Sequence, residues 1–281
     1  MASASQVSWE GAVRWLLAQP EHAQLVRDCY YDQPLTEAAE RFIASEEWQA
    51  TCELLPKARG RALDLGAGRG VSAFALARAG FRVTALEPDA SDLVGCGAIA
   101  HLAEHVPGRI EAVRGRAEAL PFADGSFDLV FCRQALHHAR DLRTFCREAA
   151  RVLSPGGRFI AVREHVISRA GDLHRFREEH PLHRLYGGES AYRSSQYLNA
   201  LRDAGLRVVR VLRSFDSPIN YAPLTGSRIC GEIEHRLRRT PVAAAVVRRV
   251  SAGASGRRAL LRLASLADRR PGRLHSFVCT K

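Results

Sequence analysis

The sequence predicts an α/β fold in which helices flank a parallel sheet. From Arg59 onward, short runs rich in β-branched and aromatic residues alternate with segments of helical spacing, the pattern of repeated strand–helix–strand units. The first predicted strand ends in a glycine-rich loop that leads directly into a helix. Gly80 and Gly205 follow two of the predicted helices, where glycine commonly ends a helix. A chain of 281 residues is long enough for one such domain with additions.

The composition is that of an ordinary globular protein without an export or membrane segment. Hydrophobic residues make up 46% and charged residues 25% of the chain. No apolar run reaches 18 residues, and Glu10 lies where a signal peptide needs an apolar stretch. The seven cysteines are scattered and form no CxxC pair, which excludes a disulfide framework or a zinc module. We therefore expect a cytoplasmic protein with no membrane span.

Residues 1–56 are predicted to form a helical lid. Ser8 and Ser45 are placed to cap helices, and proline interrupts the helical pattern after each of three segments. Five aromatic residues gather in this region: Trp9, Trp15, Tyr30, Tyr31 and Trp48. Two interpretations remain open, namely packing onto the main domain and a lid over a ligand.

The central region is predicted to hold the sheet, as a core of residues 57–215 and 273–281. The predicted strands are 62–65, 81–87, 110–113, 127–132, 158–163, 206–215 and 274–280, and helices are expected at 71–79, 92–104, 141–152 and 191–204. Residues 216–272 form an arginine-rich, helical insertion before the last strand.

Most of the excess positive charge lies near the carboxyl end of the chain. The formal net charge is +11, and residues 226–281 hold 13 basic but only 3 acidic side chains. All but two of the 41 basic residues are arginine, which indicates coding bias rather than selection for phosphate contacts. Residues 257–270 can form a basic amphipathic helix that either lies on a membrane or covers a substrate pocket with its arginines in solvent.

The loop after the first predicted strand is a candidate ligand site. Glycine occupies positions 66, 68 and 70 there, and Asp64 precedes them by two residues. Glycines at this point let the backbone approach a ligand at a helix N-terminus. A dinucleotide-binding fingerprint would require a glycine at position 71, but this chain has valine there. The pattern therefore disfavours NAD and FAD as ligands. Glu87 ends the second strand, where a carboxylate can accept both hydroxyls of a ribose.

These features in order resemble the class I S-adenosylmethionine-dependent methyltransferases of the ubiquinone/menaquinone-biosynthesis-like (methyltransferase type 11) branch. The resemblance is carried by LDLGAGRG at 63–70, TALEPD at 84–89, GRAEALPFADGSFDLVFCRQALHH at 115–138 and ARVLSPGGRF at 150–159. It implies a Rossmann-like, doubly wound, seven-stranded sheet, mostly parallel with an antiparallel last strand, plus helical cap additions.

The resemblance also implies residues for the cofactor, S-adenosylmethionine. Gly66 and Gly68 would line its methionine side, and Glu87 would hold its ribose. Asp64 would order the glycine loop or hold the cofactor's amino group.

The adenine and sulfonium would be contacted by a second set of residues. Ala117 would offer its backbone to adenine, flanked by Arg116 and Glu118, and Arg133 and Gln134 would cover the cofactor near its sulfur. Arg116 departs from the family pattern, which often has an aspartate that accepts from the adenine amine. Arginine has no acceptor, so Glu118 or a backbone carbonyl must substitute, or Arg116 must stack on the base.

Three residues are candidates for catalysis. His138 follows the fourth predicted strand, and Glu164 and His165 leave the fifth at its ligand-facing end. Methyl transfer needs a base only if the acceptor arrives protonated, and histidine is the natural base near neutrality. The same histidines can equally serve loop packing and hydrogen bonding.

The connection at residues 174–189 contains three histidines, three glutamates and a tyrosine. A metal site is conceivable, but His180 and His183 lack a specific ligand spacing, so no metal is expected. A mobile gate over the substrate is the preferred interpretation.

The leading functional hypothesis is transfer of a methyl group to an O, N or C nucleophile of a small, apolar or natural-product-like molecule. Residues 1–56, 165–190 and 216–272 are candidate caps over that molecule. The alternatives are a nucleic-acid (RNA) methyltransferase and a non-catalytic or membrane-surface protein on the same fold. Residues 132–137 lack the Asn/Asp-Pro-Pro-aromatic loop of amino-methylating DNA enzymes, which disfavours nucleic acid. Homo-oligomer formation stays open.

Overall fold

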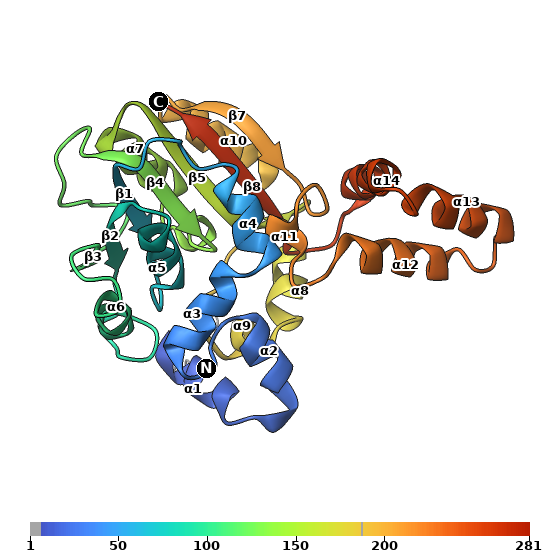
Figure 1. The fold of residues 1–281 in the computed structure, drawn as a ribbon, viewed down its shortest axis with the longest axis horizontal. Coiled ribbons are helices and arrows are strands. Elements are labelled where there is room, and N and C mark those ends of the chain that lie inside the picture. The colour runs from blue at the N-terminus through green and yellow to red at the C-terminus, as the bar shows by residue number, and fades with distance from the viewer. Residues whose placement is uncertain (1–6, 187) are drawn as a thin grey trace.

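The computed structural model describes residues 7–186 and 188–281, which form an α/β fold around one sheet (Figure 1). The strands are β1 Arg61–Leu65, β2 Arg82–Glu87, β3 Ile110–Arg114, β4 Phe127–Arg133, β5 Leu153–Ile167, β6 Tyr192–Arg193, β7 Arg207–Leu212 and β8 Arg273–Thr280. Their order is β3-β2-β1-β4-β5-β8-β7, with β6 paired to β5 off this path. Only β8 runs antiparallel to its neighbours within the described residues. The predicted fold class is confirmed.

The strand order reverses between β1 and β4. The chain proceeds outward from β1 through β2 to β3 and then returns to the other side of β1. At such a switch point the loops that leave neighbouring strands diverge and open a crevice at the carboxyl ends of the strands. The glycine loop after β1 and the segment after β4 both start at this crevice.

The short strand β6 differs from the prediction. The sequence pattern assigned residues 191–204 to one helix, whereas Tyr192 and Arg193 pair with Val166 and Ile167 of β5, and α10 (Ser194–Asp203) begins only afterwards. The cause is the length of β5, which continues four residues past the expected end and offers Tyr192 a free edge.

Helices cover both faces of the sheet because alternate residues of each strand point to opposite sides. On one face, Ala62 and Phe131 pack with α5 (Val71–Arg78) and α6 (Cys96–Ala103). On the other face, Leu63 and Val130 pack with α7 (Leu142–Val152) and α10. The two hydrophobic clusters are therefore separated by the sheet itself.

The N-terminal helices extend from the sheet across its carboxyl end (Figure 1). They are α1 Trp9–Leu17, the 3-10 turn η1 Pro20–His22, α2 Ala23–Asp28, α3 Leu35–Ile43 and α4 Glu46–Cys52. The predicted caps are confirmed, because the Ser8 and Ser45 hydroxyl oxygens accept hydrogen bonds from Gly11 N and Trp48 N, both at 3.1 Å. Helices α3 and α4 join the hydrophobic cluster of α5.

Helix α1 packs on the connection that follows β5. That connection contains α8 (Asp172–Glu178) and α9 (Pro181–Tyr186). Ala12 and Leu16 of α1 share a small cluster with Leu182 of α9, and the Trp9 and Tyr186 rings meet edge to face at 5.3 Å. We call α1, α2 and α9 together the cap.

The arginine-rich insertion forms an arm. Its helices are α11 Pro218–Tyr221, α12 Gly226–Arg236, α13 Pro241–Ser251 and α14 Ala254–Ala267. Figure 1 shows α12, α13 and α14 extending away from the sheet, and we call these three helices the arm. The arm packs on itself around Ile229, Cys230 and Leu261, and the expected cover of a substrate pocket by this insertion stays a prediction.

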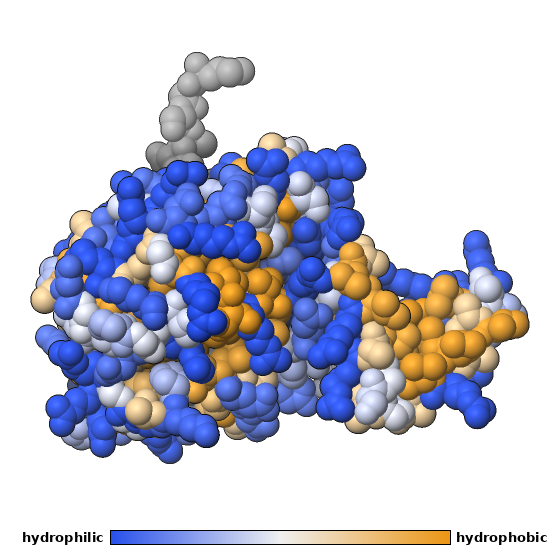
Figure 2. Space-filling view, turned by 90° about the horizontal axis from the view of Figure 1, so that it is seen from above, coloured by the Kyte–Doolittle hydropathy of each residue, from blue (hydrophilic) through white to orange (hydrophobic). Residues whose placement is uncertain are grey.

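The arm carries exposed apolar side chains that Figure 2 shows as an extended hydrophobic surface. Val242 and Leu263 are 77% and 63% exposed. No helix among the described residues is both long and apolar enough to cross a membrane.

Candidate functional site

The glycine loop after β1 turns the chain sharply into α5. Gly66 and Gly68 have φ angles of 66° and 54°, the left-handed region that side chains rarely adopt. A Cβ atom at Gly66 would lie 2.8 Å from the Cβ of Ala135, whereas one at Gly68 would meet nothing within 4 Å. Gly66 thus lets the loop close on the segment after β4, and Gly68 faces open space.

Glu87 holds this loop in place from the end of β2. Its carboxylate accepts hydrogen bonds from Gly68 N at 2.8 Å and from Asp89 N at 3.0 Å. Burial raises the pKa of Glu87, although both backbone donors favour its charged form. Each carboxylate oxygen keeps a second lone pair with which it can accept from a ligand hydroxyl.

Asp64 is buried at the end of β1 without a compensating partner. Its side chain is 1% exposed, and neither oxygen meets hydrogen-bond geometry with any described residue. Burial, reinforced by the negative charge of Glu87, raises the pKa of Asp64 to about 7. A buried, unpartnered carboxylate is costly, so it points to a missing cationic or donor partner.

These observations agree with the cofactor that the sequence implies. Asp64 offers an unpaired carboxylate for an ammonium group, Gly68 leaves room for close approach, and Glu87 offers acceptors for ribose hydroxyls. The residues present therefore fit S-adenosylmethionine.

The residues predicted to contact adenine lie on the loop after β3. Arg116 is exposed, Ala117 is 9% exposed, and Glu118 accepts a hydrogen bond from Arg140 N at 2.8 Å. Glu118 is thus partly engaged, and the exposed Arg116 can offer a base stacking or donated hydrogen bonds but no acceptor. The roles of these three residues stay predictions.

Arg133, predicted to cover the cofactor near its sulfur, instead bridges β4 to the N-terminal helices. Its guanidinium donates to both oxygens of Glu47 on α4, at 2.6 and 3.1 Å. Arg163, within β5, adds a third contact to the same carboxylate at 3.4 Å. Burial alone would raise the pKa of Glu47, but the two arginines outweigh it and hold the pKa below its usual value.

Backbone strain gathers around this bridge. Tyr30, Gln134 and Arg163 have φ angles of 59°, 53° and 61°, and all three are non-glycine residues in the left-handed region. The Arg133 guanidinium lies over the Tyr30 ring at 5.6 Å. Each such residue costs about 1–3 kcal/mol, and such strain concentrates at functional sites. Gln134, the other residue predicted near the sulfonium, accepts from Arg133 through its side-chain oxygen at 3.1 Å.

Glu164, a predicted catalytic residue, is fully buried and engaged. Its Oε1 atom accepts a hydrogen bond from Ala135 N at 3.3 Å, and its Oε2 atom accepts one from His137 N at 3.0 Å and lies 2.7 Å from His137 Nδ1. His137 belongs to the 3-10 turn η2 (Leu136–His138). Glu164 therefore orients the His137 ring and the turn after β4, and it presents no free oxygen to an acceptor.

The other two predicted catalytic residues differ in exposure. His165 is half-buried, its Nδ1 atom lies 2.8 Å from the carbonyl oxygen of Gly272, and burial lowers its pKa. The side chain of His138 is 36% exposed, and its Nε2 atom lies 3.7 Å from Glu189. The His137 ring lies between them, 4.6 Å from His165 and 4.3 Å from His138. Of the three candidates, His138 has the most exposed side chain.

Three comparisons with known proteins bear on this site. Residues 63–161 match the family model described as a methyltransferase domain. The uncharacterized methyltransferase YcgJ of Bacillus subtilis is 39% identical over 38% of this chain and 41% of its own length. The ubiquinone/menaquinone biosynthesis C-methyltransferase UbiE of Methylobacterium nodulans is 31% identical over 63% of this chain and 68% of its own length. The chain belongs to the class I S-adenosylmethionine-dependent methyltransferase family.

The solved structures agree with this methyltransferase fold. Geranyl diphosphate C-methyltransferase from Streptomyces coelicolor, solved with Mg²⁺, geranyl diphosphate and S-adenosyl-L-homocysteine, superposes with a TM-score of 0.57. It is 16% identical, and the match covers 95% of this chain and 87% of that one. The chain spans less than two thirds of several curated relatives, including 62% of the Nitrobacter hamburgensis UbiE.

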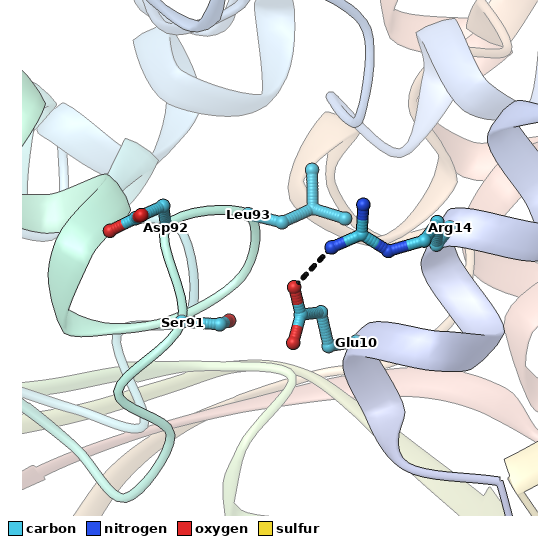
Figure 3. Close-up of a pocket in the computed structure, with 5 residues that line it drawn as sticks. All are labelled: Glu10, Arg14, Ser91, Asp92 and Leu93. Atoms are coloured by element: carbon cyan, nitrogen blue, oxygen red, sulfur yellow. Dashed lines mark hydrogen bonds and ion pairs between the residues drawn. The ribbon is translucent and has the colours of Figure 1, made fainter.

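An open hollow lies beside α1 (Figure 3). It measures about 470 Å³ and lies between α1 and the loop that follows β2. It is lined by Glu10, Arg14, Ser91, Asp92 and Leu93. The Glu10–Arg14 ion pair at 2.6 Å points into it. Because Glu87 immediately precedes this loop, the hollow is a candidate entry for the cofactor.

Sequence reasoning missed three charged residues that organise the methyltransferase site. Glu47 lies in the first turn of α4, where acidic residues are as common on exposed helices as on buried ones. Arg163 lies within β5, and nothing in the neighbouring sequence marks it as buried or paired. Arg69 of the glycine loop donates to the carbonyl oxygen of Tyr30 at 2.6 Å, so it ties the loop to the α2–α3 connection. The sequence did offer one signal for Arg69, namely its position inside GAGRG. A long side chain in that loop must point either away from the ligand or over it.

Proposed function

We propose that this protein transfers a methyl group from S-adenosylmethionine to an O, N or C nucleophile of a small-molecule acceptor. One observation carries the proposal: the buried carboxylate of Asp64 lacks a partner beside a glycine loop that opens at Gly68. When bound, the cofactor supplies an electrophilic methyl group on a positively charged sulfur.

The chain's own residues contribute positioning and exclusion of water. Asp64 would pair with the ammonium of the cofactor, and Glu87 would accept from its ribose while it fixes the loop through Gly68 N. The cap lies over the carboxyl ends of the strands and shields the site (Figure 1). Holding the reactants in line and removing water can supply most of the acceleration of such a displacement.

Enclosure of the acceptor region supports a small molecule. His137 and Glu164 are each less than 9% exposed, and so is His183, which α9 contributes beside them. A polymer could not reach this depth without displacing the cap. The relative named UbiE and the structure of geranyl diphosphate C-methyltransferase favour an apolar acceptor. Both are named C-methyltransferases, so among oxygen, nitrogen and carbon they favour carbon as the methylated atom.

The charge of the arm is the observation that favours a nucleic-acid substrate. The arm extends away from the carboxyl ends of the strands, however (Figure 1). A nucleic acid whose phosphates bound to the arm would therefore not place one of its bases in the crevice. We therefore prefer the small-molecule acceptor.

Isothermal titration calorimetry with S-adenosylmethionine tests the proposal. We expect binding in the micromolar range by the wild type and at least about tenfold weaker binding by Asp64→Asn, because a charge-assisted contact is worth about 1.5–3 kcal/mol. Asp203→Asn is the matched control, since Asp203 lies in an exposed ion pair with Arg143. Absence of binding by the wild type would refute the proposal.

A further inference from the structure

Three side chains converge beside the crevice in a way that the proposed reaction does not use. Consecutive His137 and His138 lie on η2, and Glu189 approaches them from the segment after α9. His137 Nε2 lies 3.5 Å from Glu189 Oε2, and His138 Nε2 lies 3.7 Å from Glu189 Oε1. One donor atom from each residue lies within 4.8 Å of the other two.

These separations are longer than the about 2.7–2.9 Å of a short hydrogen bond between charged groups, so any direct contact between them is weak. His137 itself provides the comparison, because its other ring nitrogen lies 2.7 Å from Glu164. Glu189 Oε2 is buried and has no hydrogen-bond partner among the described residues. The three groups face one another across a gap that none of them closes.

The gap has the dimensions of a metal site. Imidazole nitrogen and carboxylate oxygen bind zinc at about 2.0–2.2 Å, so neighbouring ligand atoms in a tetrahedron are separated by about 3.3–3.6 Å. The separations of 3.5 and 3.7 Å, each to a different oxygen of Glu189, lie close to that range, and the three donor atoms taken one per residue lie within 4.8 Å of one another, so a small side-chain adjustment would close them on one ion. We propose that His137, His138 and Glu189 bind a divalent transition-metal ion of the zinc type.

The surroundings of the three ligands support this assignment. Ligating histidines commonly donate their second ring N–H to a carboxylate, and Glu164 lies in that position beside His137. Glu164 is itself held by backbone N–H groups of Ala135 and His137. The two carboxylates, Glu164 and Glu189, together balance the charge of a divalent ion.

Three protein ligands leave one coordination position open, as in catalytic zinc sites. The turn η2 follows Ala135, which lies against Gly66 of the cofactor loop, so the open position adjoins the proposed methyl donor. An acceptor oxygen bound there would be oriented and kept deprotonated. This role for the ion rests on the proposed methyl transfer, whereas binding of the ion does not.

The test measures metal binding directly in the full-length protein. Protein stripped with a chelator is titrated with Co²⁺, followed by its visible absorption, and with Zn²⁺ in competition with a chromophoric chelator. We expect one equivalent to bind, with affinity at least about 100-fold lower in Glu189→Gln and His138→Gln. Glu164→Gln, which weakens the support of the His137 ring and of its turn but removes no ligand, should lower the affinity by about 10–100-fold.

A matched control is available on α6. His101 and His105 are an exposed pair whose rings lie 5.4 Å apart, and the double variant His101→Gln/His105→Gln should bind zinc as the wild type does. If Glu189→Gln binds zinc as tightly as the wild type, or if the control variant loses the binding, the assignment is wrong.

A second readout guards against variants that fold poorly. Zinc should raise the melting temperature of the wild type and of the control, and it should leave that of Glu189→Gln unchanged; no zinc-dependent rise in the wild type would overturn the proposal. Calorimetry with the cofactor on the same samples separates the two proposals. Cofactor binding without zinc binding would remove only the metal site, and zinc binding without cofactor binding would remove only the methyltransferase proposal.

Discussion

At the scale of single residues, the cofactor half of the site depends on one destabilised carboxylate. Asp64 occupies a buried position that would favour its neutral form, and Glu87 nearby favours that form further. A ligand ammonium would reverse this preference, because an opposite charge within a few ångströms favours the charged carboxylate. The residue thus couples cofactor binding to the loss of a proton.

This coupling predicts a pH dependence of cofactor affinity. The pKa of Asp64 is raised to about 7, and the charged form is the one that binds an ammonium. Affinity should therefore fall as the pH falls through 7, by up to about tenfold per pH unit below it. Calorimetry at pH 6, 7 and 8 measures the effect. Asp64→Asn should bind weakly at every pH, and an equally steep dependence in that variant would assign the proton to another group.

At the scale of secondary-structure elements, the Glu47 carboxylate joins α4 to the ends of β4 and β5. Glu47 is 2% exposed, and it lies between Arg133 and Arg163. Two arginines would remain buried without a counter-charge if it were removed. The N-terminal helices and the sheet are thus joined by a buried ionic contact as well as by apolar packing.

Substitution of Glu47 should therefore be costly. We expect Glu47→Gln to lower the free energy of unfolding by about 3–5 kcal/mol, the range for breaking one side of a buried ion pair. Glu46→Gln, one residue earlier and exposed, should change it by less than about 0.5 kcal/mol. Denaturant unfolding followed by circular dichroism measures both. Similar losses in the two variants would show that the bridge contributes nothing specific.

The elements differ in how far the sequence predicts them. The loop after β1 and the alternating strands follow from local patterns, and their positions were predicted within a few residues. The bridge could not be predicted, because Glu47 and Arg133 are separated by 86 residues and nothing in the local pattern marks a buried glutamate. Glu164 was predicted to lie near the acceptor from its strand position, but its contact with His137 depends on how the turn after β4 folds back.

At the scale of the whole molecule, the arm is a separate structural unit. Its cluster of Ile229, Cys230 and Leu261 is distinct from the two clusters that cover the sheet. The net positive charge of the protein resides mostly in this unit and its flanks. The core that holds the proposed cofactor site is close to neutral, so charge and proposed catalysis are spatially separated.

Shortening the arm should leave the core intact. Helix α13 buries only Val247 fully, so replacing residues 238–253 by a Gly/Ser link of about ten residues should change the melting temperature by less than about 4 °C. Cofactor affinity should also be unchanged. Differential scanning calorimetry and cofactor titration measure the two quantities, and a large drop in either would show that the arm supports the core.

The contact between Arg69 and Tyr30 also has a mechanical consequence. Arg69 belongs to the cofactor loop, and its guanidinium holds the backbone of the α2–α3 connection that leads into the cap. A movement of this connection would therefore reach the glycine loop directly, so the contact links the cap mechanically to the proposed cofactor site.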